Sequence, residues 1–439
     1  MSQALERPRV APPLAPGLPL PDGRGATHAP PFRLPGQHFA AALGFWLAGA
    51  IALVGIAPDV AQGLFPLPRV VAVTHLFTLG WITTSILGAL YQFLPVALGV
   101  PIRWQRLAHV TFWLHVPGLV LFAGGLAWAA WPAVLVGAML FASGLLLFLA
   151  NLGATLRRCR ARDVTWWALA AAGLFLLATI ALGLALATNL GRGFLGAHRF
   201  LAVTVHAHVA LFGWVLLVVI GVAQRLLPMF LLSHGAPEWP GKAAAALVGA
   251  GVGGLALLHH VVPMAVYWGP GLLIALGTVA FLLQAALFFR HRKRPALDAG
   301  LRLAAVALGF LALALALAPF ALSRGFAAPR VGTAYLTALI VGGFGLFVAG
   351  HYYKILPFLV VFHRYGHLMG KRPIPRTGDL YDGRIAGAAV ALLAAGALGL
   401  VLSTLAGAPL PARVSAIVFA AGAATEVAQM YVISRRRPE

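Results

Sequence analysis

Acidic residues and cysteines are scarce in this sequence. Its 439 residues include only 10 Asp and Glu and a single cysteine, Cys159, and all charged residues together make up 10% of the chain. A soluble domain carries roughly 25% charged residues, so this chain lacks what a water-facing surface needs. One cysteine cannot form an internal disulfide or a thiolate metal cluster. The composition therefore excludes a cytoplasmic enzyme, a secreted disulfide scaffold and a disordered chain.

Long apolar runs dominate instead, with 61% hydrophobic residues and a mean hydropathy of +0.90. A helix needs ~20 apolar residues to cross a bilayer, and twelve runs are long enough. They cover residues 39–62, 70–98, 106–129, 132–152, 164–189, 199–228, 242–262, 267–289, 299–321, 332–362, 385–406 and 412–433. The sequence thus predicts an all-α, polytopic membrane protein with twelve transmembrane helices. Residues 1–38, rich in Pro, Ala and Gly, predict a disordered cytoplasmic tail.

The basic residues predict the orientation. The net charge is +22, and 24 of the 32 Lys and Arg fall in the tail, the C-terminus and the loops on the same side, against 6 in the opposite loops. Positive charge collects on the cytoplasmic side, which predicts a plasma membrane protein with both termini in the cytoplasm. The partner is then the lipid bilayer and not nucleic acid. The two remaining cations, Arg225 and Lys354, are expected to extend to the lipid headgroups.

An internal repeat relates helices 2, 6 and 10. Aligned on their last proline, the three helices share a Leu-Pro pair, a glycine seven residues before that proline and another glycine near the middle. The first aligned positions are His75, His208 and Thr337, and the prolines are Pro95, Pro228 and Pro357. The spacings of 133 and 129 residues correspond to four helices. We therefore predict three four-helix units, at about 39–152, 164–289 and 299–433.

Five histidines are predicted to lie at one depth in the outer half of the membrane. They are His75 on helix 2, His206 and His208 on helix 6, and His259 and His260 on helix 7. Histidine within a membrane usually marks an ion, cofactor or proton site, and three imidazole nitrogens suit copper, zinc or iron. The alternative is a set of histidines that only hydrogen-bond between helices.

In its twelve predicted helices, its three repeats and its histidines on helices 2, 6 and 7, the chain resembles the catalytic subunits of the heme-copper oxidase superfamily. That superfamily includes cytochrome oxidases and nitric oxide reductases. That family is similar in having twelve helices in three arcs. The resemblance implies that His75 is a heme b ligand, and that His206 or His208, with His259 and His260, binds copper. It also implies electron transfer, a reaction with O₂ or NO, and a separate electron-donor subunit or quinol.

The tenth helix departs from the family pattern. The family carries a His-x-His pair there, whereas this chain has Thr337 and, near the cytoplasmic end, His351. The triplet His206-Ala207-His208 resembles that missing pair, so a heme shared between helices 2 and 6 is our hypothesis. No tyrosine follows His208 in the family's position, which holds Phe212.

Glu426 is an acid inside the apolar run 412–433, and we expect it either to handle protons or to hydrogen-bond between helices. No catalytic residue can be assigned. If the protein is an enzyme, it is an oxidoreductase of the heme-copper type. The alternatives are a non-enzymatic heme- or metal-binding protein for NO response, sensing or cofactor assembly, and a transporter without metal.

Overall fold

The computed structural model describes residues 30–258, 267–324 and 327–438. It is 85% helical, and the described residues form no strand. Twelve helical spans are long and apolar enough to cross a membrane, which confirms the predicted number and makes the chain a multi-pass membrane protein. The spans are Arg33–Ala61, Pro68–Leu98, Gln105–Ala127, Trp131–Leu156, Val164–Arg192, Gly196–Leu231, Trp239–Leu258, Trp268–Arg290, Ala299–Ser323, Pro329–Leu368, Gly383–Ala406 and Pro409–Arg435.

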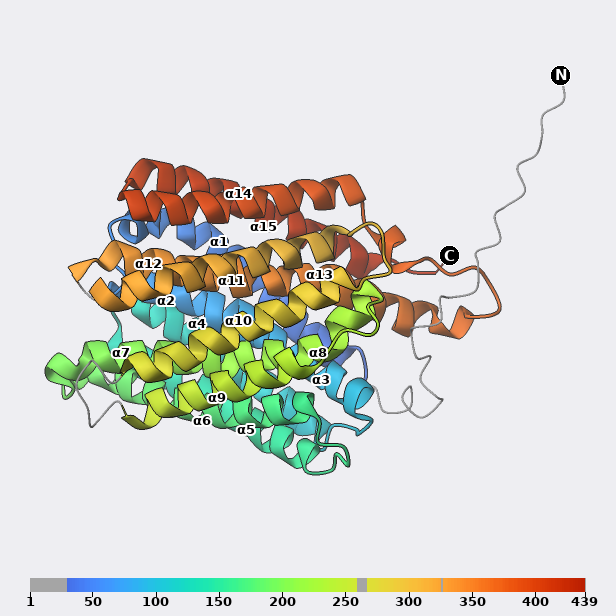
Figure 1. The fold of residues 1–439 in the computed structure, drawn as a ribbon, viewed down its shortest axis with the longest axis horizontal. Helices are drawn as coiled ribbons and strands as arrows, with labels where there is room; N and C mark the ends of the chain where they lie inside the picture. The colour runs from blue at the N-terminus through green and yellow to red at the C-terminus, as the bar shows by residue number, and fades with distance from the viewer. Residues whose placement is uncertain (1–29, 259–266, 325–326, 439) are drawn as a thin grey trace, which may run out of the picture.

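Nine of the spans are each one α-helix, and the other three are divided into shorter helical segments. The single helices are α1 (Arg33–Ala61), α4 (Gln105–Ala127), α5 (Trp131–Leu156), α6 (Val164–Arg192), α9 (Trp239–Leu258), α10 (Trp268–Arg290), α11 (Ala299–Arg324), α14 (Gly383–Ala406) and α15 (Pro409–Arg435). Figure 1 shows them lying side by side, with α14 and α15 along one edge of the bundle. Short connections pair neighbours in the chain, so α4 packs on α5, α9 on α10 and α14 on α15.

The three divided spans are the second, sixth and tenth, and each contains an eight-residue π-helical segment. The order is α2 (Pro68–His75), η2 (Leu76–Thr83) and α3 (Thr84–Leu98); then α7 (Arg199–His208), η4 (Val209–Leu216) and α8 (Leu217–Leu231); then α12 (Pro329–Thr337), η7 (Ala338–Gly345) and α13 (Leu346–Val360). Each π segment therefore starts directly after His75, His208 or Thr337. A wider π turn inside an α-helix is often found at functional sites.

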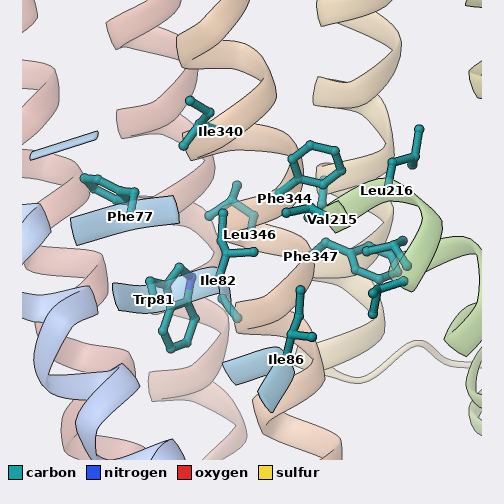
Figure 2. Close-up of a cluster of buried hydrophobic side chains, with 14 of the residues drawn as sticks. Phe77, Trp81, Ile82, Ile86, Val215, Leu216, Ile340, Phe344, Leu346 and Phe347 are labelled. Atoms are coloured by element: carbon teal, nitrogen blue, oxygen red, sulfur yellow. The ribbon is translucent and has the colours of Figure 1, made fainter. Parts of the chain in front are cut away.

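These π segments meet in the centre of the main hydrophobic core. Figure 2 shows Trp81, Val215 and Phe344 among the side chains that the three spans contribute to it. Two indole hydrogen bonds join the segments: Trp81 Nε1 donates to the carbonyl of Gly345 (3.0 Å), and Trp214 Nε1 donates to the Thr83 hydroxyl (3.2 Å). The spans that carry the predicted histidines are thus fixed to one another.

The first helix begins earlier than predicted. Residues 33–38 belong to α1 and not to a disordered tail, because Leu34, Pro35 and His38 are buried against the bundle. Proline within the predicted tail suggested an irregular segment, but proline is tolerated in the first turn of a helix, where no backbone partner is lost. Residues 1–29 lie outside the described residues.

Arg225 and Lys354 do not simply extend to the headgroups. Arg225 forms an ion pair with Asp163, and Lys354 forms one with Asp298. The Lys354 side chain is only 12% exposed, so the prediction was wrong for this residue. An acid on a neighbouring element offers a buried cation a partner, and a single sequence does not reveal that pairing.

Asp163 both caps the start of α6 and forms an ion pair, and this leads to a prediction about stability. Its Oδ1 accepts a hydrogen bond from the backbone N–H of Trp166 (3.0 Å), and its Oδ2 pairs with Arg225. We expect Asp163→Ala to lower the free energy of unfolding by about 1 kcal/mol through loss of the cap. Asp163→Asn keeps a capping oxygen, so thermal unfolding in detergent should show a smaller loss. Equal losses in both variants would assign the effect to the ion pair.

Asp382 caps α14 and gives a prediction about pH. Its Oδ1 accepts hydrogen bonds from the backbone N–H groups of Ile385 (3.1 Å) and Arg384 (2.7 Å), which lower the pKa of the carboxyl. A group with a lowered folded-state pKa stabilises the protein at neutral pH and loses that effect as the pH falls through this pKa. The stability advantage of the wild type over Asp382→Ala should therefore shrink below about pH 4. A difference that stays constant between pH 7 and pH 3 would contradict this role.

Candidate functional site

His75 and His208 occupy equivalent places, at the last residue of α2 and of α7. His75 Nδ1 lies 2.8 Å from the carbonyl oxygen of Val71, and His208 Nδ1 lies 2.8 Å from that of Thr204. A carbonyl oxygen only accepts, so each Nδ1 carries the proton and each neutral ring keeps its lone pair on Nε2. A hydrogen bond on the far nitrogen is what orients an imidazole for metal ligation.

The surroundings of His75 are apolar. The ring of Phe122 on α4 meets the His75 ring edge-on, with centroids 5.1 Å apart. Phe122 belongs to a small hydrophobic cluster that is separate from the main core. Its buried members are Phe45, Ala72, Leu119, Phe122, Leu126, Val134, Ala138 and Ala187. This cluster excludes water from one side of the histidine and provides the kind of wall on which a flat apolar ligand packs.

His206, on α7, lies near the same apolar cluster, on the side formed by α6. Its ring lies against α6, beside Thr179 and Gly183, where a Cβ built on Gly183 would approach Cε1 to 3.1 Å. His206 Nδ1 is buried and has no hydrogen-bond partner among the described residues. Gly183 lies one helical turn before Ala187, a member of the cluster around Phe122. His75 and His206 therefore lie beside the same apolar cluster, on two different spans.

His208 points elsewhere, because two residues along a helix differ by roughly 200° in direction. Its Nε2 lies 3.4 Å from the hydroxyl of Tyr335 on α12, and the two rings are nearly parallel, at 18°. Phe212 stacks on the His208 ring at 5.8 Å. His206 and His208 thus face different neighbours and are not placed to share one ion with His75.

Tyr335 is a neighbour that the sequence did not identify. It lies two residues before Thr337, at the position that the repeat aligns with His206. Searching for an aromatic or polar residue at that aligned position on the tenth span would have found it. The family resemblance pointed only to the position four residues after His208, which holds Phe212.

The other two predicted metal ligands, His259 and His260, lie outside the described residues. The description ends at Leu258 in α9 and resumes at Tyr267. Among the residues that are described, no group of three or more His, Cys, Asp and Glu is arranged to hold a metal ion. The copper site therefore stays a prediction.

Glu426 lies fully buried between α15 and α1. Its Oε2 accepts a hydrogen bond from Trp46 Nε1 (3.1 Å), and its Oε1 has no partner in the described part of the chain. Trp46 in turn stacks on Trp81, with ring centroids 4.7 Å apart. One of the two predicted roles, a hydrogen bond between helices, is present, and proton handling stays a prediction.

Comparison with known proteins adds no assignment. No protein-family model matches the chain, and no curated protein matches it. The functional conclusion therefore depends on the residues themselves. Two neutral imidazole side chains on separate spans, next to an apolar cluster, are the kind of groups that ligate metal ions.

Proposed function

We propose that this chain is a heme- and/or copper-binding membrane protein of the respiratory type, and that His75 and His206 hold a heme b between the second and sixth spans. The observation that supports the proposal is that these two imidazoles lie beside one apolar cluster: His75 packs on Phe122, and His206 packs on Gly183, one turn from Ala187. Both rings have a nitrogen free to ligate: Nε2 of His75, whose Nδ1 is engaged by Val71, and the unpartnered Nδ1 of His206.

The residues present fit such a group. A noncovalent heme needs axial ligands and an apolar pocket, and the cluster around Phe122 supplies apolar surface next to His75. When bound, the heme supplies one-electron transfer at a potential that its axial ligands tune. The chain itself would orient the His75 ring through Val71, position His206 against Gly183, and exclude water with the apolar side chains of α4 and α5.

Copper is proposed for the second part of the site. His208 presents Nε2 toward Tyr335, and the family resemblance would complete the ligand set with His259 and His260. The Tyr335 hydroxyl would donate a hydrogen bond to His208 Nε2 when that nitrogen binds no metal. The assignment divides the two histidines of α7 between two centres.

The three-unit architecture is part of this proposal. The π segments η2, η4 and η7 fall at the aligned positions of the repeat, and their middle glycines pack in the same way. A Cβ on Gly80 would approach Phe45 of α1, one on Gly213 would approach Phe175 of α6, and one on Gly342 would approach Phe310 of α11. Each contact is to the first helix of the unit concerned, which supports a common packing plan.

The two indole hydrogen bonds support the same plan. Trp81 and Trp214 are aligned residues, and so are their acceptors, Gly345 and Thr83. The first unit donates to the third and the second unit donates to the first, as expected for rotation about a central pseudo-threefold axis. The third unit has Gly343 at the aligned position, so it has no side chain with which to close the ring.

A visible spectrum and a metal analysis of the same purified sample test the proposal. We expect reduced-minus-oxidised bands of a b-type heme, at about one heme per chain, and copper if His208 and the paired histidines bind it. A featureless spectrum together with absent metal would contradict the proposal and favour a transporter.

The enzymatic and non-enzymatic forms of the proposal differ in turnover. An oxidoreductase acting on O₂ or NO should consume one of these gases catalytically when a reductant and an electron mediator are supplied. A protein for NO response, sensing or cofactor assembly should bind heme or NO stoichiometrically and then stop. Gas consumption measured with an electrode on the heme-loaded protein separates the two.

A further inference from the structure

A second polar cluster lies at the other end of the bundle and takes no part in the proposed heme site. It is formed by His38 on α1, Tyr91 on α3, and Thr111 and His115 on α4, which we call the dihistidine cluster. All four residues are at most 2% exposed. One polar atom of each has no hydrogen-bond partner among the described residues: His38 Nε2, Tyr91 Oη, Thr111 Oγ1 and His115 Nδ1.

The four residues lie close to one another. The rings of His38 and Tyr91 have centroids 5.4 Å apart, and those of His38 and His115 are close enough to interact electrostatically. The hydroxyl groups of Tyr91 and Thr111 are close enough for one to donate to the other. Two glycines allow this approach: a Cβ on Gly88 would lie 2.8 Å from His38 Cβ, and one on Gly144 would lie 2.9 Å from the Thr111 carbonyl oxygen.

The hydrogen bonds that are present fix the tautomer of each histidine. His38 Nδ1 donates to the carbonyl of Leu34 (2.9 Å), which leaves a lone pair on Nε2. The Thr84 hydroxyl donates its only proton to the carbonyl oxygen of Leu79 (2.9 Å). The hydroxyl oxygen also lies 3.0 Å from His115 Nε2, and it must accept a hydrogen bond there. His115 therefore carries its proton on Nε2 and a lone pair on Nδ1. The two unpartnered nitrogens are both acceptors.

One of the two hydroxyl groups, those of Tyr91 and Thr111, can donate to the other, which leaves one hydroxyl proton for a further partner. The cluster thus offers two acceptors and one donor, which is three of the four hydrogen bonds that one water molecule can make. A buried water typically makes about three hydrogen bonds to groups that would otherwise be unsatisfied. A metal cation fits less well, because the cluster holds no carboxylate and an uncompensated charge is costly in the membrane interior.

A polar pair lies between the cluster and the start of α4. His109, the fifth residue of α4, lies with Nδ1 3.2 Å from Oε1 of Gln37. Gln37 precedes His38 directly, and its Nε2 also lacks a partner among the described residues. From the start of α4 at Gln105 to His115 is about 15 Å along the helix.

We propose that the dihistidine cluster binds an internal water molecule, and that Gln37 and His109 connect this water to the membrane surface on the side of the C-terminus. The cluster is then a hydrated site about 15 Å deep in the bundle. Water at this depth makes the neutral imidazoles of His38 and His115 reachable by protons from that surface. The proposal does not depend on heme or copper, because every group in it belongs to α1, α3 and α4.

Radiolytic hydroxyl labelling in H₂¹⁸O tests the proposal on the full-length protein in detergent. Radicals form from water and modify only side chains next to it. We expect Tyr91, although buried, to acquire ¹⁸O at a rate comparable with the exposed Tyr431. Phe281, which is equally buried, should stay unmodified. Protection of Tyr91 to the level of Phe281 would overturn the proposal.

Variants separate water from a metal ion. Thr111→Val removes one donor at nearly constant shape, and His115→Leu removes one acceptor, so both should lower Tyr91 labelling several-fold. Thr278→Val is the matched control, since the hydroxyl of Thr278 already donates to Ile274 within its own helix; labelling should not change. If a variant does not fold, the comparison of Tyr91 with Phe281 in the wild type still decides. A stoichiometric metal ion that is lost in His38→Gln would overturn the water assignment and favour a cation.

Discussion

Replacement of His75 by alanine is expected to abolish the low-spin heme spectrum of the purified protein. The same loss is expected for His206→Ala, because each imidazole would supply one of the two axial ligands. His208→Ala should keep the low-spin bands, because His208 faces Tyr335 and not His75. Reduced-minus-oxidised spectra of the three variants, each normalised to protein, measure this directly.

A matched control is available for these variants. His291, just after α10, makes the same Nδ1 contact with the carbonyl four residues before it (2.9 Å), but it lies far along the chain from the site. His291→Ala should leave the heme spectrum unchanged. If His208→Ala loses the low-spin bands while His206→Ala keeps them, His208 and not His206 is the second heme ligand. If none of the variants changes the spectrum, any bound heme lies elsewhere.

Substitution of Gly350 by alanine is expected to destabilise the bundle strongly. Gly350 lies on α13, and an added Cβ would lie 2.6 Å from the carbonyl oxygen of Gly300 and 3.0 Å from the backbone nitrogen of Ala304. Both are backbone atoms of α11, so no side chain can rotate away. Overpacking of this kind costs about 1–3 kcal/mol. Thermal unfolding of the variant in detergent should show a clear decrease in Tm.

Gly332→Ala provides the control for this prediction. Gly332 lies on α12, where an added Cβ meets nothing within 4 Å. Because alanine has a higher helix propensity than glycine by up to about 1 kcal/mol, this variant should be as stable as the wild type or more so. A loss of stability equal to that of Gly350→Ala would mean that the close approach of α13 to α11 is not what requires the glycine.

The number and places of the helices could be predicted from the sequence, because a span is set by the local count of apolar residues. The start of α1 could not, since Leu34 and His38 are held in the helix by contacts with other spans. The same limit applies to Asp298 and Lys354, which meet only in the folded bundle. Hydropathy describes a residue's relation to lipid and says nothing about its neighbours in the protein.

The candidate site shows a similar division. Depth along a helix follows from the rise per residue, which places His75 and His206 at one level. Helix geometry alone separates the directions of His206 and His208. The neighbours that each ring faces, Gly183 for His206 and Tyr335 for His208, depend on the packing of the other spans and appeared only in the structure. The π segments were also not predicted, because segments such as Leu76–Thr83 are as apolar as the α-helical parts of the same spans. The dihistidine cluster joins His38 and His115, which lie 77 positions apart.

The central claim is that a heme lies between the second and sixth spans, with His75 and His206 as its axial ligands. A cryo-electron microscopy map of the purified protein in a lipid nanodisc tests it most directly. Our account predicts a flat macrocycle density between the two imidazoles, in contact with Phe122. A map in which the two side chains are resolved at this place, with only protein or lipid between them, would contradict it.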